Sequence, residues 1–224
     1  MIITGAGNGI GLATVKFLAE SRKHCILAVS RNTVRLRNLR NPKVIPCSAD
    51  LSLPGSATEI AREAENRLAY VDILIHNAGQ LVNKAFTDQT EEDYHTQFDV
   101  NVKAVFLLTR EIIPLMRPGS HILMISSMGG YQGSQKYPGL SLYSASKAAI
   151  CSLTECLAAE LGPYGIRANC LALGAVDTPM LKKAFPGYQA PVSAAKMGQY
   201  IADFALRGSE YHQGKIIPVS TSNP

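Results

Sequence analysis

The sequence predicts a single-domain α/β protein, in which a doubly wound parallel sheet of about seven strands carries helices on both faces. Short apolar runs alternate with amphipathic segments along the whole chain, the pattern of repeated strand–helix units. At 224 residues, with 46% hydrophobic and 17% charged residues, the chain suits one ordinary globular domain with a substantial core. Linkers, repeats and low-complexity tracts are not evident, so residues 1–224 are expected to form one unit.

Each predicted element has its own local pattern. The strands are short apolar runs, at 2–4, 25–29, 43–47, 71–76, 121–125, 166–171 and 215–219. The helices show apolar residues at helical spacing, over 10–21, 57–68, 142–161, 196–206 and 91–116, the last as one long helix or two abutting ones that prolines stop. Ligands of parallel sheets bind at the carboxyl ends of strands, so site residues are expected directly after them.

Charge and cysteine content narrow the function classes. The net charge of +5 is modest, and its clearest basic cluster has no interleaved aromatics, which argues against nucleic acid as a partner. Five cysteines show neither Cys-x-x-Cys pairs nor metal-like spacing with the five histidines, which predicts free thiols, a reducing compartment and no metal site. Neither a signal-like leader nor a membrane-spanning apolar stretch is evident, so a cytoplasmic protein without a membrane partner is expected.

Gly5, Gly9 and Gly11 lie between the first predicted strand and the first predicted helix. Glycine permits a tight turn and close approach of backbone to a pyrophosphate, while the helix N-terminus offers unpaired N–H groups. This position at the head of a β-α-β unit favours a dinucleotide site over an ordinary strand–helix turn.

Ser30 and Arg31 end the second predicted strand, and neither Asp nor Glu occurs between Ser21 and Lys43. An acidic residue at this place binds the ribose 2′-hydroxyl of NAD, whereas an arginine accommodates the 2′-phosphate of NADP. NADP(H) is therefore the expected cofactor, with NAD(H) possible. The alternative is a solvated arginine in a basic loop.

Tyr143 and Lys147 are four positions apart in the predicted helix 142–161. Residues at this spacing lie on one helix face about a turn apart. A phenol titrates near pH ~10 and a lysine near pH ~10.4, so neither is an obvious acid–base catalyst at neutral pH. A positive charge near the phenol favours the phenolate, which predicts a lowered pKa for Tyr143 and a role in proton transfer. The alternative is a surface tyrosine beside a solvated lysine.

Further short motifs follow the predicted strands in order. They are Thr4-Gly5-Ala-Gly-Asn8-Gly9-Ile10-Gly11, Asp50-Leu51, Asn77-Ala78-Gly79, Asp99-Val-Asn101-Val102, Ile125-Ser-Ser127, Tyr143-Ser-Ala-Ser-Lys147 and the segment from Gly174 to Met180. With these motifs the chain resembles the short-chain dehydrogenase/reductase family over most of its length. The resemblance implies a Rossmann-type fold and an NADP(H)-dependent oxidoreductase that transfers a hydride between nicotinamide and a carbonyl or secondary alcohol.

The resemblance also implies a role for each motif. Tyr143 would exchange a proton with the substrate oxygen, Ser127 would polarise that oxygen, Lys147 would bind the nicotinamide ribose, and Asn101 would hold a relay water. The cofactor would contact Thr4, Gly5, Asn8, Gly9, Ile10, Gly11, Ser30, Arg31, Asp50, Leu51, Asn77, Ala78, Gly79, Tyr143, Lys147, Gly174, Val176 and Thr178. In isolation, Asn101 could instead cap or kink the long helix, Ser127 end a strand, and Thr178 cap a turn.

The chain departs from the family pattern near the expected substrate. Ser127 and Tyr143 are 16 positions apart, wider than usual, which predicts an enlarged loop over 129–141. Leu173 replaces a proline, and the expected lid near 179–195 is short, which implies an open site or one closed by another subunit. Candidate pocket residues are Gln80, Leu81, Val82, Tyr131, Tyr137 and Met180.

Two functions remain open from the sequence. The first is an enzyme that acts on a small-molecule carbonyl or alcohol; the second is a catalytically silent NADP(H)-binding regulatory or scaffold protein of the same fold. The family's habit of pairing through the long helices implies a homodimer or homotetramer.

Overall fold

The computed structural model describes residues 1–221, so the last three residues of the predicted domain 1–224 lie outside the described part. Its main sheet has seven parallel strands in the order β3-β2-β1-β4-β5-β6-β9. The strands are β1 (Ile2–Thr4), β2 (Ile26–Ser30), β3 (Val44–Ser48), β4 (Ile73–His76), β5 (His121–Ser127), β6 (Arg167–Leu173) and β9 (Ile216–Val219). The predicted Rossmann-type sheet is confirmed.

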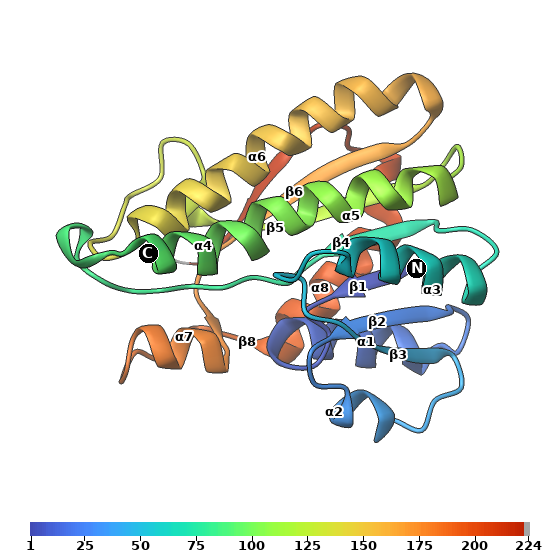
Figure 1. The fold of residues 1–224 in the computed structure, drawn as a ribbon, viewed down its shortest axis with the longest axis horizontal. Coiled ribbons are helices and arrows are strands. Elements are labelled where there is room, and N and C mark those ends of the chain that lie inside the picture. Colours follow the sequence, from blue (N-terminus) through green and yellow to red (C-terminus); the bar gives the residue numbers. More distant parts are fainter. Residues whose placement is uncertain (222–224) are drawn as a thin grey trace.

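Helices cover both faces of this sheet (Figure 1). On one face lie α1 (Gly9–Glu20) and α8 (Ala194–Arg207), which pack so closely that a Cβ on Gly198 would stand 2.6 Å from the Cβ of Ala13. The other face carries α3 (Ser56–Arg67), α5 (Ala104–Ile112) and α6 (Ser141–Leu161).

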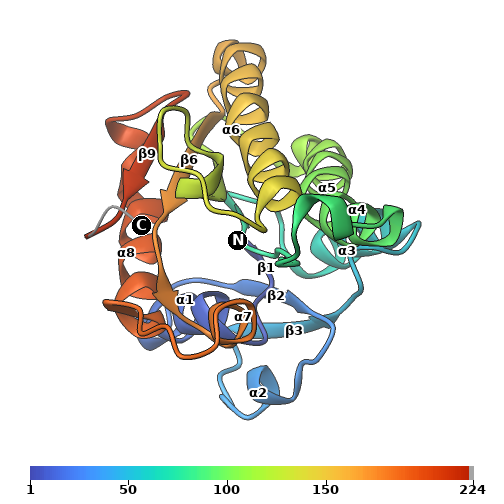
Figure 2. The ribbon, with the colours of Figure 1, turned by 90° about the vertical axis from the view of Figure 1, so that its left-hand side faces the viewer.

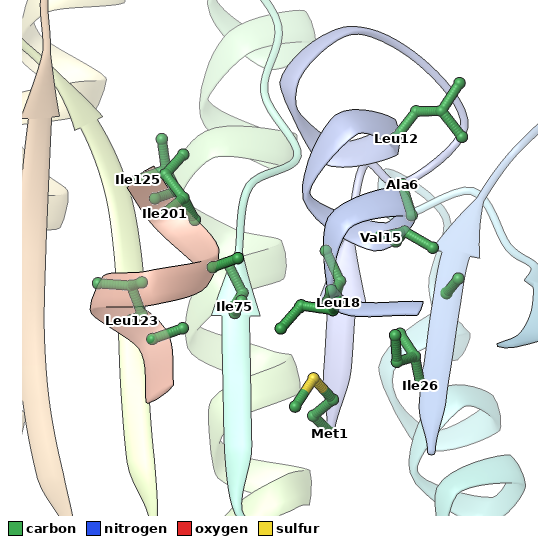
Figure 3. Close-up of a cluster of buried hydrophobic side chains, with 14 of the residues drawn as sticks. Met1, Ala6, Leu12, Val15, Leu18, Ile26, Ile75, Leu123, Ile125 and Ile201 are labelled. Carbon is green, nitrogen blue, oxygen red and sulfur yellow. The ribbon is translucent and has the colours of Figure 1, made fainter. Parts of the chain in front are cut away.

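The buried core fills the space between these layers. Figure 3 shows the cluster that joins α1 and α8 to the strands, with Leu18, Ile75 and Ile201 among its members. A second cluster joins α3 and α5 to the sheet, and a third lies beneath α6. Burial of these apolar side chains holds the strand ends in fixed relative positions.

The predicted long helix 91–116 is interrupted. It consists of α4 (Glu91–Phe98), one π-helical turn at Asp99–Lys103, α5, and a 3₁₀ turn at Ile113–Leu115. Thr90 and Asp93 form a reciprocal capping box that starts α4. The π turn inserts an extra residue in the helix and places Asn101 on its inner side, 1% exposed.

Several short elements were not predicted from the pattern. They are α2 (Val34–Arg37), α7 (Pro179–Ala184) and the two-stranded pair of β7 (Val176–Asp177) with β8 (Val192–Ser193). Strands β5 and β6 each extend two residues beyond their predicted ends, because Ser126 and Ser127 pair with Ala172 and Leu173. Within the described chain no helix has both the length and the apolar character needed to span a bilayer.

The strand order reverses between β1 and β4. Chain segments leaving the carboxyl ends of these two strands diverge to opposite sides, which creates a crevice at this edge of the sheet.

Candidate active site

A cavity of about 1030 Å³ lies at the carboxyl ends of the strands. It is lined by segments that follow β1, β2, β3, β4, β5 and β6, and by one side of α6. Of the predicted site residues, all but Thr4 and Asn101 line this cavity. The fold therefore brings together residues that are up to 173 positions apart, from Gly5 to Thr178, in one cavity.

The glycine turn between β1 and α1 is shaped for close backbone contact. Gly5 has φ +65°, and a Cβ there would lie 2.8 Å from the Cα of Ala78. A Cβ on Gly11 would lie 2.3 Å from the carbonyl oxygen of Gly5. Since only glycine fits at these positions, the first turn of α1 presents its N–H groups and its positive dipole end to the cavity.

Thr4 lies behind this turn and binds the segment after β4. Its hydroxyl oxygen accepts hydrogen bonds from the backbone N–H groups of Asn77 and Ala78, both at 3.1 Å. The Asn77 amide in turn donates to the carbonyl oxygens of Thr4 and Gly5, at 3.0 and 3.3 Å. These bonds fix the crevice between β1 and β4, which gives Thr4 and Asn77 a structural task beside any contact with a ligand.

Arg31 is exposed and lines the part of the cavity that Asp50 also lines. It lies close enough to Asp50 to lower the pKa of that carboxyl group. The pKa of Asp50 is lowered mainly by hydrogen bonds from Ser52, with Arg31 adding to the effect. The Arg31 guanidinium is therefore exposed to solvent and accessible to an anion that enters this end of the cavity.

Two residues at this end were not among the predicted site residues, although Arg35 belongs to the basic cluster of the sequence and Gly7 to its glycine motif. Arg35 donates from Nη1 to the side-chain oxygen of Asn8 at 2.8 Å, which places a second cation against the glycine turn. Gly7 permits Ser30 to approach, because a Cβ on Gly7 would lie 2.3 Å from the Ser30 hydroxyl oxygen. The position of Arg35 could not be predicted, because α2, which carries it, has only four residues and no apolar periodicity. Gly7 lies within the glycine motif that the sequence analysis identified.

Tyr143, Ser127 and Lys147 converge on the opposite wall of the cavity. The Ser127 hydroxyl lies near enough to the Tyr143 phenol to act on its pKa, and the Lys147 ammonium lies 5.9 Å from the centre of the Tyr143 ring. Lys147 is 5% exposed and donates to the carbonyl oxygen of Ile125 at 3.0 Å. The i, i+4 spacing therefore puts both side chains on the face of α6 that meets β5.

Burial controls the titration of this pair. It raises the pKa of Tyr143, against the opposing effect of the hydrogen bond from Ser127. It also lowers the pKa of Lys147 to about 8, because the ammonium is removed from water. The predicted lowering of the Tyr143 pKa by Lys147 is therefore wrong for this structure. Burial raises this pKa, and the lysine ammonium is directed at the Ile125 carbonyl oxygen instead.

Asn101 does not line the cavity but supports it. Its side-chain oxygen accepts from the backbone N–H of Gln80 at 2.8 Å, and its amide donates to the Gln80 carbonyl and the Ser146 hydroxyl, both at 2.9 Å. Ser146 donates onward to the carbonyl oxygen of Tyr143 at 2.7 Å. Asn101 thus connects the segment after β4 to the first turns of α6.

The wide spacing between Ser127 and Tyr143 leaves Ser127 in place. Directly after β5, a 3₁₀ turn (Met128–Gly130) packs against α6 so tightly that a Cβ on Gly130 would lie 2.4 Å from the carbonyl carbon of Lys147. Ser127 ends β5 and accepts from the Gly129 N–H at 3.1 Å. The extra residues form a loop between this turn and α6, beside β9 (Figure 2).

Gly174, Val176 and Thr178 follow β6 along the cavity wall. Thr178 caps α7 by accepting from the Leu181 N–H at 3.2 Å, and its methyl carbon lies 3.5 Å from the point where a Cβ on Gly9 would stand. Thr178 therefore both starts the predicted lid segment and faces the glycine turn.

The predicted pocket residues divide between two cavities. Gln80, Leu81, Tyr137 and Met180 line the first cavity, joined by Lys183, Phe185 and Tyr188 from the lid segment. Tyr131 lines a second cavity, between the 129–141 loop, α6 and β9, and Val82 donates its N–H to Gln97 at 3.1 Å. The Tyr137 hydroxyl is buried and forms no hydrogen bond with the described residues.

Within residues 1–221, no group of three or more His, Cys, Asp and Glu side chains is arranged to hold a metal ion.

Comparisons with known proteins agree with this geometry. The family model of short chain dehydrogenases matches residues 1–189. An uncharacterized oxidoreductase of Staphylococcus epidermidis is 30% identical over 184 residues, which cover 80% of this chain and 78% of that protein. A similar oxidoreductase of Staphylococcus aureus is 30% identical over 185 residues, covering 79% and 78%.

Solved structures share the fold over nearly the whole chain. A short-chain dehydrogenase from Burkholderia cenocepacia in complex with NADP has a TM-score of 0.87 and 24% identity, covering 99% of this chain and 96% of that one. A 3-ketoacyl-(acyl-carrier-protein) reductase from Brucella melitensis complexed with NADH has a TM-score of 0.86 and 25% identity, covering 97% and 95%. Both cofactor forms thus occur among structures similar to this chain.

Proposed function

Because the chain belongs to the short-chain dehydrogenase/reductase family of oxidoreductases, we propose that it interconverts a small-molecule carbonyl compound and a secondary alcohol with NADP(H). The observation that carries this proposal is the convergence of Tyr143, Ser127 and Lys147 on one wall of a cavity whose opposite end is the glycine turn.

The cavity fits a dinucleotide along its length. The backbone between Gly5 and Gly11 would hold the pyrophosphate, since the missing Cβ atoms leave the amides accessible. Asp50 and Leu51 would contact the adenine, and the segment of Asn77, Ala78 and Gly79 would lie beneath the adenosine ribose and the pyrophosphate.

Arg31 would bind the 2′-phosphate, with Ser30 beside it. Arg35 adds a second positive charge within reach of the same anion, because it is tied to Asn8 on the glycine turn. Two arginines and no competing carboxylate from Ser21 to Lys43 support NADP(H) over NAD(H).

When bound, the nicotinamide supplies or accepts the hydride. Gly174, Val176 and Thr178 would position its carboxamide, and Lys147 its ribose. Tyr143 would transfer the proton: with its pKa raised by burial, the phenol is protonated at neutral pH and can donate to a carbonyl oxygen. Ser127 would donate a hydrogen bond to the same oxygen and so stabilise the negative charge that develops on it.

Proton resupply would pass beside Gly79. A Cβ on this residue would stand 3.3 Å from the Lys147 ammonium and 3.4 Å from the Asn101 side-chain oxygen, so glycine keeps the space between these two groups clear. One lone pair of the Asn101 oxygen remains after its bond from Gln80 and could accept from a relay water.

The substrate would enter between the 129–141 loop and the lid segment near 179–195. Met180, Phe185, Tyr188 and Tyr137 make this end aromatic and apolar, with Lys183 at its margin. The lid segment is held at one point by the Asn83 amide, which donates to the Ala184 carbonyl at 2.9 Å.

The full chain would function as a homodimer or homotetramer in the cytoplasm. The outer face of α5 exposes Phe106, 50% accessible, with Arg110 stacked over its ring at 5.9 Å. Neighbouring α6 exposes the small residues Ala145, Ala148 and Ala159, which permit close helix packing. Light scattering of the chain and of Phe106→Glu tests this: the variant should dissociate, and a monomeric unmodified chain contradicts the assembly.

A panel of carbonyl compounds tests the activity, with NADPH oxidation followed for the unmodified chain and for Tyr143→Phe. The enzyme should turn over at least one compound, and the variant should bind NADPH equally while losing about 10²-fold or more in rate. If both proteins bind NADPH and neither reduces any compound, the catalytically silent NADP(H)-binding protein becomes the better account.

Cofactor preference is tested separately by direct binding. NADPH should bind more tightly than NADH, and Arg31→Asp should level or reverse the difference. Equal affinities in the unmodified chain contradict the role of Arg31.

A further inference from the structure

Two cysteines lie in contact beneath α6, one helical turn beyond Lys147. Cys151 projects from α6 and Cys170 from β6, both belong to the apolar cluster beneath α6, and each thiol acts on the pKa of the other. The Cys151 thiol also donates to the Ser126 hydroxyl at 3.4 Å, and Ser126 donates to the Lys147 carbonyl at 2.8 Å. The sequence gives no sign of this pair, since 19 positions separate the two residues.

The two thiols differ in access. Cys170 is fully buried, whereas Cys151 is half-buried and lines the second cavity beside Gly130, Ala148 and Ile216. This cavity, about 1320 Å³, is bounded by the 129–141 loop and β9, and Cys151 does not line the first cavity. A small solute can therefore meet Cys151 without passing through the proposed cofactor site.

The electrostatic surroundings also differ. The hydrogen bond from Cys170 lowers the pKa of Cys151, with Ser126 and the Lys147 charge adding to the effect. Pairing and burial raise the pKa of Cys170. The accessible thiol is thus the one that ionises more readily, and the thiolate is the reactive form of cysteine.

We propose that Cys151 and Cys170 form an oxidisable dithiol, in which Cys151 reacts with a hydroperoxide entering the second cavity and Cys170 closes a disulfide between α6 and β6. The Cys151 thiolate attacks a peroxide oxygen, the O–O bond breaks, and a sulfenic acid forms with release of water or an alcohol after proton uptake. The Cys170 sulfur then attacks the sulfenic sulfur, the S–S bond forms, the S–O bond breaks, and the Cys170 proton leaves with the oxygen as water.

The disulfide acts on the proposed active site, and this part rests on the proposed function. Closing the bond draws α6 toward β6 in the turn that holds the Lys147 carbonyl to Ser126 and the Lys147 ammonium to Ile125. A displaced Lys147 no longer holds its position beside Tyr143 in the proposed active site. Oxidation should therefore lower turnover, and reduction with dithiothreitol should restore it.

Thiol counting and peptide mapping test the dithiol without any need for turnover. The full chain is treated with hydrogen peroxide, denatured, and assayed with a thiol reagent; the five thiols should fall to three. A digest kept free of reductant should contain the peptide of Cys151 linked to that of Cys170. Cys151→Ser and Cys170→Ser should abolish the link, whereas Cys156→Ser, an exposed position of the same helix, should retain it.

Each outcome decides one part. Five remaining thiols, or a link that involves Cys25 or Cys47 instead, overturns the dithiol even if the protein proves to be an active reductase. A Cys151–Cys170 link in protein that keeps full turnover overturns the coupling to Lys147. The map is read from the unmodified chain first, so poor folding of a serine variant does not obscure the result.

Discussion

Replacing Asn101 by alanine should destabilise the protein strongly, because this side chain is a buried connection between three segments. The variant loses hydrogen bonds of 2.8, 2.9 and 2.9 Å to Gln80 and Ser146. Each such bond contributes about 1 kcal/mol net, and buried partners left unpaired cost about 1–3 kcal/mol apiece. Since Asn101 is 1% exposed, water cannot replace the lost partner without rearrangement, and the free energy of unfolding should fall by about 2–4 kcal/mol.

Urea unfolding followed by circular dichroism measures this loss, with Asn83→Ala as the matched control. Asn83 also donates one amide hydrogen bond, at 2.9 Å to Ala184, but is exposed, so its variant should lose less than about 0.5 kcal/mol. Asn101→Asp keeps the acceptor for the Gln80 N–H and removes both donors, so its loss should be comparable to that of alanine. A loss below about 1 kcal/mol for Asn101→Ala would refute the argument that this residue clamps the segment after β4 to α6.

Three further predictions concern other parts of the molecule. Gly11→Ala should lose about 1–3 kcal/mol of stability and most of its NADPH affinity in titrations, since a Cβ would lie 2.3 Å from a backbone oxygen of the glycine turn. In the control Gly162→Ala the Cβ would be 3.4 Å from its nearest neighbour, so neither stability nor NADPH affinity should change. Burial lowers the pKa of His76 to about 3, so the folded state binds fewer protons than the unfolded state below pH 6.5. Stability should therefore fall by about 1.4 kcal/mol per pH unit from this group as the pH drops from 6.5 toward 3, and urea titrations of His76→Gln should show a shallower slope. Tyr137→Phe removes a buried hydroxyl that has no hydrogen-bond partner within residues 1–221, so the urea midpoint of the variant should stay equal or rise. A loss above about 1 kcal/mol would show that the hydroxyl is hydrogen-bonded in solution.

Much of the fold could be predicted because it depends on local patterns. Buried parallel strands are short apolar runs, and their alternation with helices predicts a doubly wound parallel sheet. The strand order, and with it the crevice after β1 and β4, came from the structure. The glycine turn followed directly, since Gly5 and Gly11 stand where the backbone must approach a neighbour. Ser127 kept its place despite the wide spacing, because its position is set by β5 and not by the loop that follows.

The remainder depended on contacts between distant segments. The π turn around Asn101 reflects its bonds to Gln80 and Ser146, which local periodicity does not encode. Arg35 acquires its place from α2 packing beside the glycine turn. The direction of the Tyr143 pKa shift required knowledge of burial, because the same Tyr-x-x-x-Lys spacing in water would be governed by the lysine charge.

Deuterium transfer tests the central claim most directly. NADPH deuterated at both C4 positions is mixed with the unmodified chain and a carbonyl compound from the panel, and the product is examined by mass spectrometry. One deuterium should appear on the carbinol carbon for each NADPH consumed, with Tyr143→Phe binding the cofactor but forming at least ~10²-fold less labelled alcohol. Unlabelled product, or equal labelling by Tyr143→Phe, would contradict hydride transfer with Tyr143 as the proton donor.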